Sequence, residues 1–221
     1  MRLGNISIVA SKQIQKYRFE SMDSVTDGND KALSINQFLQ ALAMTLAVRN
    51  KDTWEHSVQV TKYAVRLGLR LELSVEEIKQ LHIGALLHDI GKIGIRDDIL
   101  LKPCALTEDE YCQLKKHPEI GSKILEPASA LDCIIPIVLH HHEHFDGKGY
   151  PQKLRGEKIP FLARIISLAD AFEAMTSDRL YRKAMTPQHA LEEIQLQLGR
   201  QFDPYLGKAF VKMIKEVDFT L

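Results

Sequence analysis

Apolar residues recur at intervals of three and four along most of this chain, and that spacing constrains its fold more than any other feature. The clearest early example spans residues 31–50, with Ile35, Phe38, Leu42 and Leu46. This is the period of an amphipathic helix. The alternating pattern of a half-buried strand is absent apart from a short stretch at Ile6–Val9. The sequence therefore predicts an all-α fold.

Capping residues mark several helix starts. Ser74 and Thr107 are each followed three residues later by glutamate, which is the capping-box pattern. Thr186 and Asp203 are each followed by proline, which suits the first helical position. The remaining apolar segments expected to be helical are residues 54–70, 131–139 and 161–175.

Turn-forming residues predict the loops and the domain boundary. Residues 145–160 hold three glycines and two prolines and predict one long loop. Residues 21–30 are polar and turn-rich, and about 30 residues are too few for a sensor domain of ordinary size. We therefore expect an N-terminal segment or linker over residues 1–30 and a single domain over residues 31–221.

Composition narrows the partners and the compartment. Lys+Arg and Asp+Glu both number 29, so no broad basic field favours duplex DNA or an anionic membrane. No apolar run approaches the ~18 residues of a membrane span, and the N-terminus does not resemble a signal peptide. The three cysteines are an odd number without zinc-motif spacing. We interpret them as reduced thiols, which predicts a cytoplasmic protein.

Histidine is the unusual component of the chain. Of its nine histidines, six fall between His88 and His144. His88 and Asp89 end an apolar helix, where an unpaired carboxylate would be costly to bury. A divalent cation would remove that cost, because imidazole and carboxylate are ordinary metal ligands. Alone, a His-Asp pair is more simply explained as a hydrogen-bonded pair at a helix end.

Two further residues favour the metal-binding interpretation over the hydrogen-bonded pair. Asp170 lies inside the apolar run 165–172, and His56 lies near the start of another predicted helix. Together with His88 and Asp89 they form an H…HD…D set that resembles the HD superfamily of metal-dependent phosphohydrolases. Three more imidazoles, which a second metal would need, are supplied by His117, His141 and His142.

The segment from His141 to Pro151 reads HHEHFDGKGYP and resembles the HHExxDGxGYP signature of the HD-GYP family. The family's other blocks follow in order: HDIGKIGI at 88–95, LKP and LT at 101–107, HPEIG at 117–121, and ARIISLADAFEAMTSDRLYR at 163–182. The resemblance covers roughly residues 33–213. It implies an HD-domain helical bundle with an extended GYP loop.

The resemblance also implies a ligand set for two divalent metals. The first metal would be held by His56, His88, Asp89 and Asp170. The second would be held by His117, His141 and His142, with Asp89 bridging the two. Mixed imidazole and carboxylate ligands suit iron or manganese and leave zinc open. Some family members hold a third metal through a glutamate four residues before the first histidine. Asp52 occupies that place here, and a helix-start Asp without metal is an equal alternative.

Substrate contacts are implied at four further positions. Lys92, Arg179 and Arg182 would bind phosphate, and Tyr150 would contact the ligand. Lys92 would also stabilise the leaving oxygen, which makes Asp89 and Lys92 the expected catalytic pair. His140 is not expected to be a ligand, and Glu143 is expected to orient a histidine. The family pattern is broken at Arg96, Cys104 and Leu180, none of which removes a predicted ligand.

The expected activity is hydrolysis of cyclic di-GMP to pGpG, and to GMP after a second cut, by a metal-activated hydroxide. One alternative is a receptor that binds the nucleotide without cleaving it. Another is an HD hydrolase that acts on a different nucleotide, such as cyclic GMP-AMP. Family members associate with diguanylate-cyclase-type (GGDEF) proteins, so such partners are candidates. The oligomeric state and the regulator are left open.

Overall fold

The structure is a computed structural model that describes residues 29–178 and 183–218. Within these ranges the chain is helical, and its only β-type pairing is an isolated bridge between Leu198 and Phe202. The longer helices are α2 (Asn29–Arg49), α3 (Lys51–Arg70), α4 (Val75–Leu87), α7 (His117–Leu125), α9 (Phe161–Thr176), α10 (Pro187–Leu196) and α11 (Pro204–Asp218). The shorter ones are α5 (Asp97–Leu100), α6 (Glu108–Leu114), α8 (Ile135–His140), η1 (Ile90–Gly94), η2 (Ser129–Leu131) and η3 (Gly156–Lys158). The all-α prediction is confirmed.

The chain divides into two compact units, Met1–Trp54 and Glu55–Leu221. The described part of the first unit holds α2 and the first turn of α3. There the side-chain oxygen of Asn50 accepts the backbone N–H of Thr53 at 3.1 Å, so α3 begins earlier than its apolar pattern indicated. The domain boundary after residue 30 stays a prediction, and the expected short strand at Ile6–Val9 lies outside the described residues.

The predicted caps open their helices. The side chains of Ser74 and Thr107 each accept a backbone N–H from three residues later, and their own backbone N–H groups donate to the glutamate carboxylate at that position. The Thr186 side chain accepts from His189 at the start of α10. The Asp203 carboxylate accepts the Tyr205 N–H at 2.8 Å at the start of α11. These contacts are local, so they follow directly from sequence spacing.

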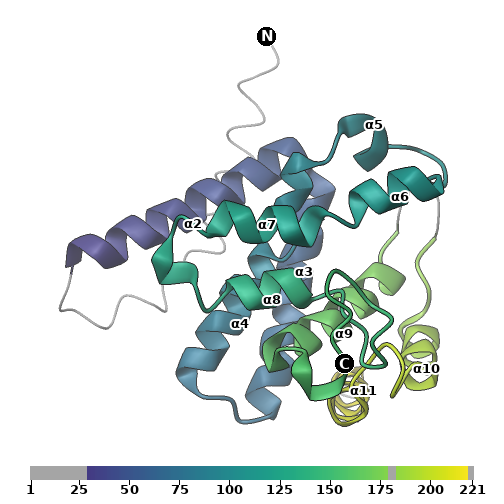
Figure 1. The fold of residues 1–221 in the computed structure, drawn as a ribbon. Coiled ribbons are helices and arrows are strands. Elements are labelled where there is room, and N and C mark those ends of the chain that lie inside the picture. The colour runs from purple at the N-terminus through teal and green to yellow at the C-terminus, as the bar shows by residue number, and fades with distance from the viewer. Residues whose placement is uncertain (1–28, 179–182, 219–221) are drawn as a thin grey trace. The chain divides into compact units, whose positions relative to one another are not determined.

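Three aromatic rings join the helices in the core of the second unit. Tyr63, Phe172 and Phe210 meet edge to face, with ring centroids 5.1 to 6.4 Å apart. They tie α3 and α11 to α9. In the same unit α9 packs against α4, α8, α10 and α11 (Figure 1). Because α9 lies at the centre of these contacts, much of its surface is buried.

The helices η1 and α7 approach each other closely. A Cβ atom on Gly91 would lie 1.8 Å from the carbonyl oxygen of His117, so only glycine allows these segments to touch. The contact places the residue before η1, Asp89, against the first residue of α7.

None of the helices in the described ranges combines the length and the apolar character that a membrane span requires.

Candidate metal centre

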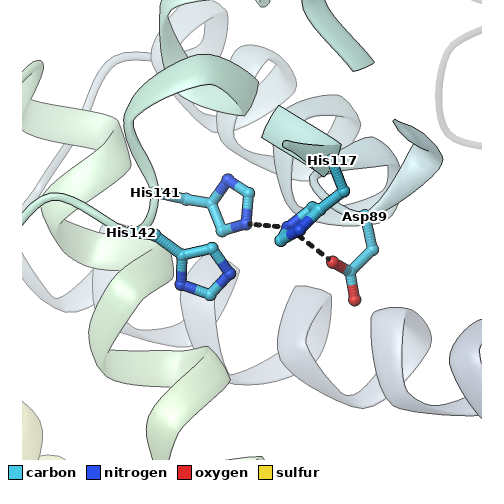
Figure 2. A group of neighbouring side chains, drawn as sticks. All are labelled: Asp89, His117, His141 and His142. Carbon is cyan, nitrogen blue, oxygen red and sulfur yellow. Dashed lines mark hydrogen bonds and ion pairs between the residues drawn. The ribbon is translucent and has the colours of Figure 1, made fainter. Parts of the chain in front are cut away.

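Seven histidine and aspartate side chains gather in the second unit, in two groups. In each group the potential ligand atoms all lie within 4.8 Å of one another. Six helical elements supply them, at or near the ends of α4, η1, α7 and α8 and within α3 and α9. One group comprises His56, His88 and Asp170; the other, shown in Figure 2, comprises Asp89, His117, His141 and His142.

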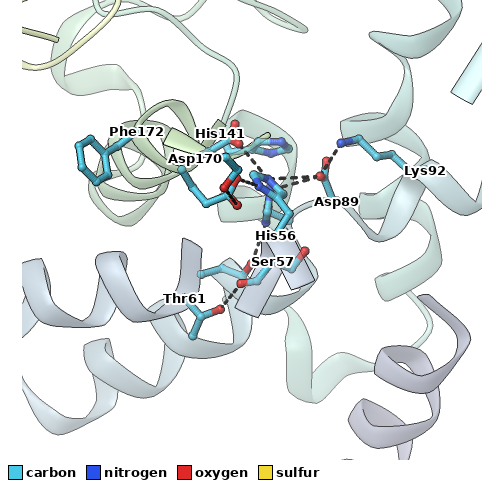
Figure 3. Close-up of polar contacts among 12 residues, drawn as sticks. His56, Ser57, Thr61, Asp89, Lys92, His141, Asp170 and Phe172 are labelled. Carbon is cyan, nitrogen blue, oxygen red and sulfur yellow. Dashed lines mark hydrogen bonds and ion pairs between the residues drawn. The ribbon is translucent and has the colours of Figure 1, made fainter. Parts of the chain in front are cut away.

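The carboxylate of Asp89 lies between the two groups. Its Oδ1 atom is 3.2 Å from His117 Nε2. Its Oδ2 atom is 3.4 Å from His88 Nε2 and 3.8 Å from His56 Nε2. Oδ2 also accepts a hydrogen bond from the Lys92 ammonium at 2.5 Å (Figure 3). Each oxygen of one carboxylate thus faces a different group, which is the arrangement that a bridging ligand needs.

Backbone carbonyls set the tautomer of three histidines. The Nδ1 atoms of His88, His117 and His141 lie 2.7 to 2.8 Å from the carbonyl oxygen three residues earlier. A carbonyl oxygen can only accept, so each Nδ1 carries the proton and each Nε2 presents a lone pair. All three lone pairs are therefore available to the centre, and the rings are held in place from behind.

This donor set fits divalent cations. His117 Nε2 and His141 Nε2 face each other at 3.3 Å, and with both Nδ1 atoms protonated neither Nε2 has a proton to share. His88 Nε2 and Asp89 Oδ1 are buried and receive no hydrogen bond from the described residues. Facing lone pairs and an unpartnered buried carboxylate oxygen are unfavourable unless a cation lies among them. The cluster can therefore hold metal.

The pKa values of the second group match that role. Burial lowers the pKa of His117 to about 4 and that of His142 to about 3. Burial also holds the pKa of His141 well below its ordinary value. Burial alone would raise the pKa of Asp89, but Lys92 and the surrounding histidines outweigh it and lower that pKa. At pH 7 these imidazoles are neutral and the carboxylate is charged, the forms that bind metals.

His56 differs from the other histidines because carboxylates contact both of its ring nitrogens. Its Nε2 atom is 3.0 Å from Asp170 Oδ1, and its Nδ1 atom bonds to Glu173. Burial lowers the pKa of His56, but hydrogen bonds to Asp170 and Glu173 outweigh burial and raise it to about 9. Glu173 was not predicted as a site residue. The available signal was an acidic residue within an apolar helix, one turn after Asp170.

The loop between α8 and α9 closes over one side of the second group. A Cβ atom on Gly149 would lie 2.2 Å from His144 N, so this glycine permits the close approach. The Tyr150 ring stacks on His142 with centroids 4.9 Å apart. Buried Glu143 accepts the backbone N–H groups of Gln152 at 2.7 Å and Leu154 at 3.1 Å. The Glu143 carboxylate thus anchors the loop, and its Oε1 atom also lies 3.7 Å from His140 Nδ1. The expectation that Glu143 orients a histidine stays a prediction.

The outer side of Tyr150 carries a cation and a second aromatic ring. The Lys115 ammonium lies 5.9 Å from the centroid of Tyr150 and 4.8 Å from that of Tyr111. Both distances are within the range of a cation–π contact. Tyr111 is 49% exposed, so its ring is open to a ligand. Together with Lys92, this gives the site positive charge on two sides.

The structure brings together all seven predicted metal ligands, although their binding roles stay predictions. Asp52 is exposed in the first turn of α3, in the other compact unit, and its role in a third metal site is untested. Arg179 and Arg182 lie outside the described residues, as does Leu180. His140, which was not expected to be a ligand, belongs to neither group.

Comparison with protein families matches residues 40–206 to the HD domain. The chain belongs to the HD domain family. Among curated proteins it is 42% identical to the cyclic di-GMP phosphodiesterase response regulator RpfG of Xanthomonas campestris, over 79% of this chain and 47% of that protein. It is 33% identical to the 3′3′-cGAMP-specific phosphodiesterase 2 of Vibrio cholerae, over 85% of this chain and 36% of that protein. The recognition of the HD-GYP motifs is confirmed.

Solved structures agree on the fold of this HD domain. A cyclic GMP-AMP specific phosphodiesterase of V. cholerae matches with a TM-score of 0.64 at 20% identity, over 82% of this chain and 49% of that one. At this identity the likeness concerns the fold, and it confirms the HD-type helical bundle. The chain spans about half the length, or less, of the curated relatives it matches.

Proposed function

We propose that this HD domain is a metal-dependent phosphodiesterase that hydrolyses cyclic di-GMP. The observation that carries the proposal is the Asp89 carboxylate, whose two oxygens face two separate groups of metal-type ligands. The substrate assignment is supported by the cyclic di-GMP phosphodiesterases among the relatives at 42% and 37% identity. Two divalent cations are proposed, with iron or manganese as the metals that suit this ligand set.

Bound cations at such a centre supply Lewis-acid activation of water and of the phosphodiester. The chain's own residues supply the rest. Asp89 holds the two groups in register, and the Lys92 ammonium beside it would stabilise charge that develops on the leaving oxygen. Tyr150 presents a ring at the edge of the centre, and Arg179 and Arg182 are proposed to bind the phosphates. Hydrolysis would give pGpG first and GMP after a second cut.

The decisive experiment uses protein purified without oxygen and analysed for metals, then incubated with cyclic di-GMP and followed by chromatography. About two equivalents of iron or manganese together with pGpG or GMP would support the proposal. A protein that binds both cations and the nucleotide but releases no product would instead be a receptor. A protein loaded in turn with iron, manganese and zinc that neither binds nor cleaves the nucleotide would overturn the proposal.

A second candidate substrate is 3′3′-cyclic GMP-AMP, because three relatives at 33 to 35% identity are named as phosphodiesterases specific for it. The comparison of kcat/KM for the two cyclic dinucleotides, measured on the same metal-loaded sample, decides between them.

The proposal includes a cytoplasmic location, which the three free cysteines support. Diguanylate-cyclase-type (GGDEF) partners are proposed only from the family resemblance.

A further inference from the structure

We propose that Glu173 is a positioning residue for His56, which fixes that ring toward Asp170 and strengthens cation binding by the group of His56, His88 and Asp170. The inference rests on the metal centre proposed above and assigns a residue outside its ligand set. Glu173 is 5% exposed and lies on α9, one turn after Asp170. Its Oε2 atom bonds to His56 Nδ1, across 117 residues of sequence.

One helix therefore holds both nitrogens of the His56 ring. Asp170 Oδ1 lies 3.0 Å from Nε2, the nitrogen that is also 3.8 Å from Asp89 Oδ2 (Figure 3). Glu173 bonds to the other ring nitrogen, Nδ1. In the neutral ring that would bind a cation, Glu173 accepts from Nδ1, so the proton stays on that nitrogen and the Nε2 lone pair is directed into the group. Rotation of the ring would break the contact with Glu173, so the lone pair has one direction.

Glu173 is itself held in place. The Ser177 hydroxyl donates to its Oε1 atom at 2.7 Å, so the two carboxylate oxygens have different donors. Ser177 is the residue that ends α9. A carboxylate fixed at both oxygens loses little further freedom when a cation binds, which favours tight binding by the histidine in front of it.

The negative charge of Glu173 makes the Nδ1 partner of His56 different from that of the other histidines. His88, His117 and His141 bond through Nδ1 to neutral backbone carbonyls. Among these four histidines in the described ranges, His56 alone has a carboxylate rather than a backbone carbonyl at its Nδ1 atom. An ionised acceptor strengthens the hydrogen bond and increases the electron density on the far nitrogen. Loss of Glu173 should therefore weaken one cation site and spare the other.

The test is a titration of the metal-free full chain with Mn²⁺ by calorimetry, with bound manganese counted after equilibrium dialysis. Glu173→Gln keeps the shape and an acceptor oxygen but removes the charge, whereas Glu173→Ala removes both. Glu173→Ala should raise the dissociation constant of one of the two sites about 10- to 100-fold, the usual effect of losing such a supporting partner. Glu173→Gln and Ser177→Ala should give smaller increases at the same site.

The matched control is Glu192→Gln, on the exposed face of α10, which should leave both sites as in the wild type. In a His117→Ala background, which weakens the other group, Glu173→Ala should raise the dissociation constant of the remaining site by the same factor. Unchanged binding at both sites in Glu173→Ala would overturn the proposal. Equal weakening of both sites, together with a lower melting temperature of the metal-free protein, would also overturn it. Absence of Mn²⁺ binding by the wild-type chain would instead refute the metal centre itself.

Discussion

The imidazole rings of His117 and His141 face each other through Nε2 atoms that lie 3.3 Å apart, while each Nδ1 bonds to a backbone carbonyl. Two neutral imidazoles cannot both keep those carbonyl bonds and share a proton between their Nε2 atoms. A cation satisfies both lone pairs at once. Because the unfolded chain does not bring these ligands together, a bound cation should stabilise the folded state relative to the unfolded state.

Metal removal should for this reason destabilise the protein. At a free Mn²⁺ concentration about 100 times the dissociation constant, binding contributes about 2.7 kcal/mol, or roughly 5–10 °C in melting temperature for a domain of this size. Calorimetric melting of chelator-treated and Mn²⁺-loaded samples measures the shift. Ca²⁺, which prefers oxygen ligands, is the control and should give little stabilisation. Identical melting of the treated and loaded samples would contradict the interpretation.

Asp89→Asn should affect both cations, because each oxygen of Asp89 faces a different group. Asparagine keeps the shape but has no charge and only one acceptor oxygen. Metal analysis should show loss of both cations, and phosphodiesterase activity should fall by more than about 100-fold, the upper end for losing a supporting partner alone. His141→Ala should remove only one cation. Asp98→Asn, at an exposed position, is the control and should leave metal content unchanged.

Sequence reasoning located the helix starts and the ligand set but not the supporting contacts. Ser74 and Thr107 could be predicted because their partners lie three residues away. The predicted start of α8 was too early, because the apolar run begins at Leu131 whereas the helix begins only at Ile135. Proline in its first turn was the available signal.

The two buried glutamates show why the remaining contacts could not be predicted. Glu173 bonds to a histidine 117 residues away, and no local spacing records such a pairing. Glu143 follows two predicted ligands, so proximity in sequence suggested a histidine partner. Its carboxylate does lie 3.7 Å from His140 Nδ1, but its hydrogen bonds come from backbone N–H groups nine and eleven residues later. Any residue except proline carries such a donor, so the side chains there give no information about it.

Glu143→Gln tests the anchoring role. The glutamine side chain has one oxygen for two N–H donors and directs an NH₂ group at the second, which leaves a buried donor unpaired at a cost of roughly 1–3 kcal/mol. The loop that carries Tyr150 should shift, so KM for the cyclic dinucleotide should rise while both cations remain bound. Glu157→Gln, in the same loop segment and exposed, is the control. Loss of metal from Glu143→Gln would show that the residue supports the ligands after all.

Lys115 should contribute to substrate binding, because its ammonium lies beside the Tyr150 ring that stacks on His142. A cyclic dinucleotide carries two negative phosphates and two aromatic bases, and the rim formed by Lys115, Tyr111 and Tyr150 offers a partner to each kind of group. Lys115→Ala should weaken binding by roughly 1–2 kcal/mol, an approximately 5- to 30-fold higher KM with kcat little changed. Steady-state kinetics on metal-loaded protein measures both constants.

The neighbouring Lys116→Ala removes the same charge from an exposed position and leaves the cation–π contacts intact, which makes it the matched control. A KM that rises equally in both variants would mean that general charge attracts the substrate, and added salt should then remove the difference from wild type. A change confined to Lys115→Ala, and shared in part by Tyr111→Ala, would instead place a base or phosphate of the substrate at this rim.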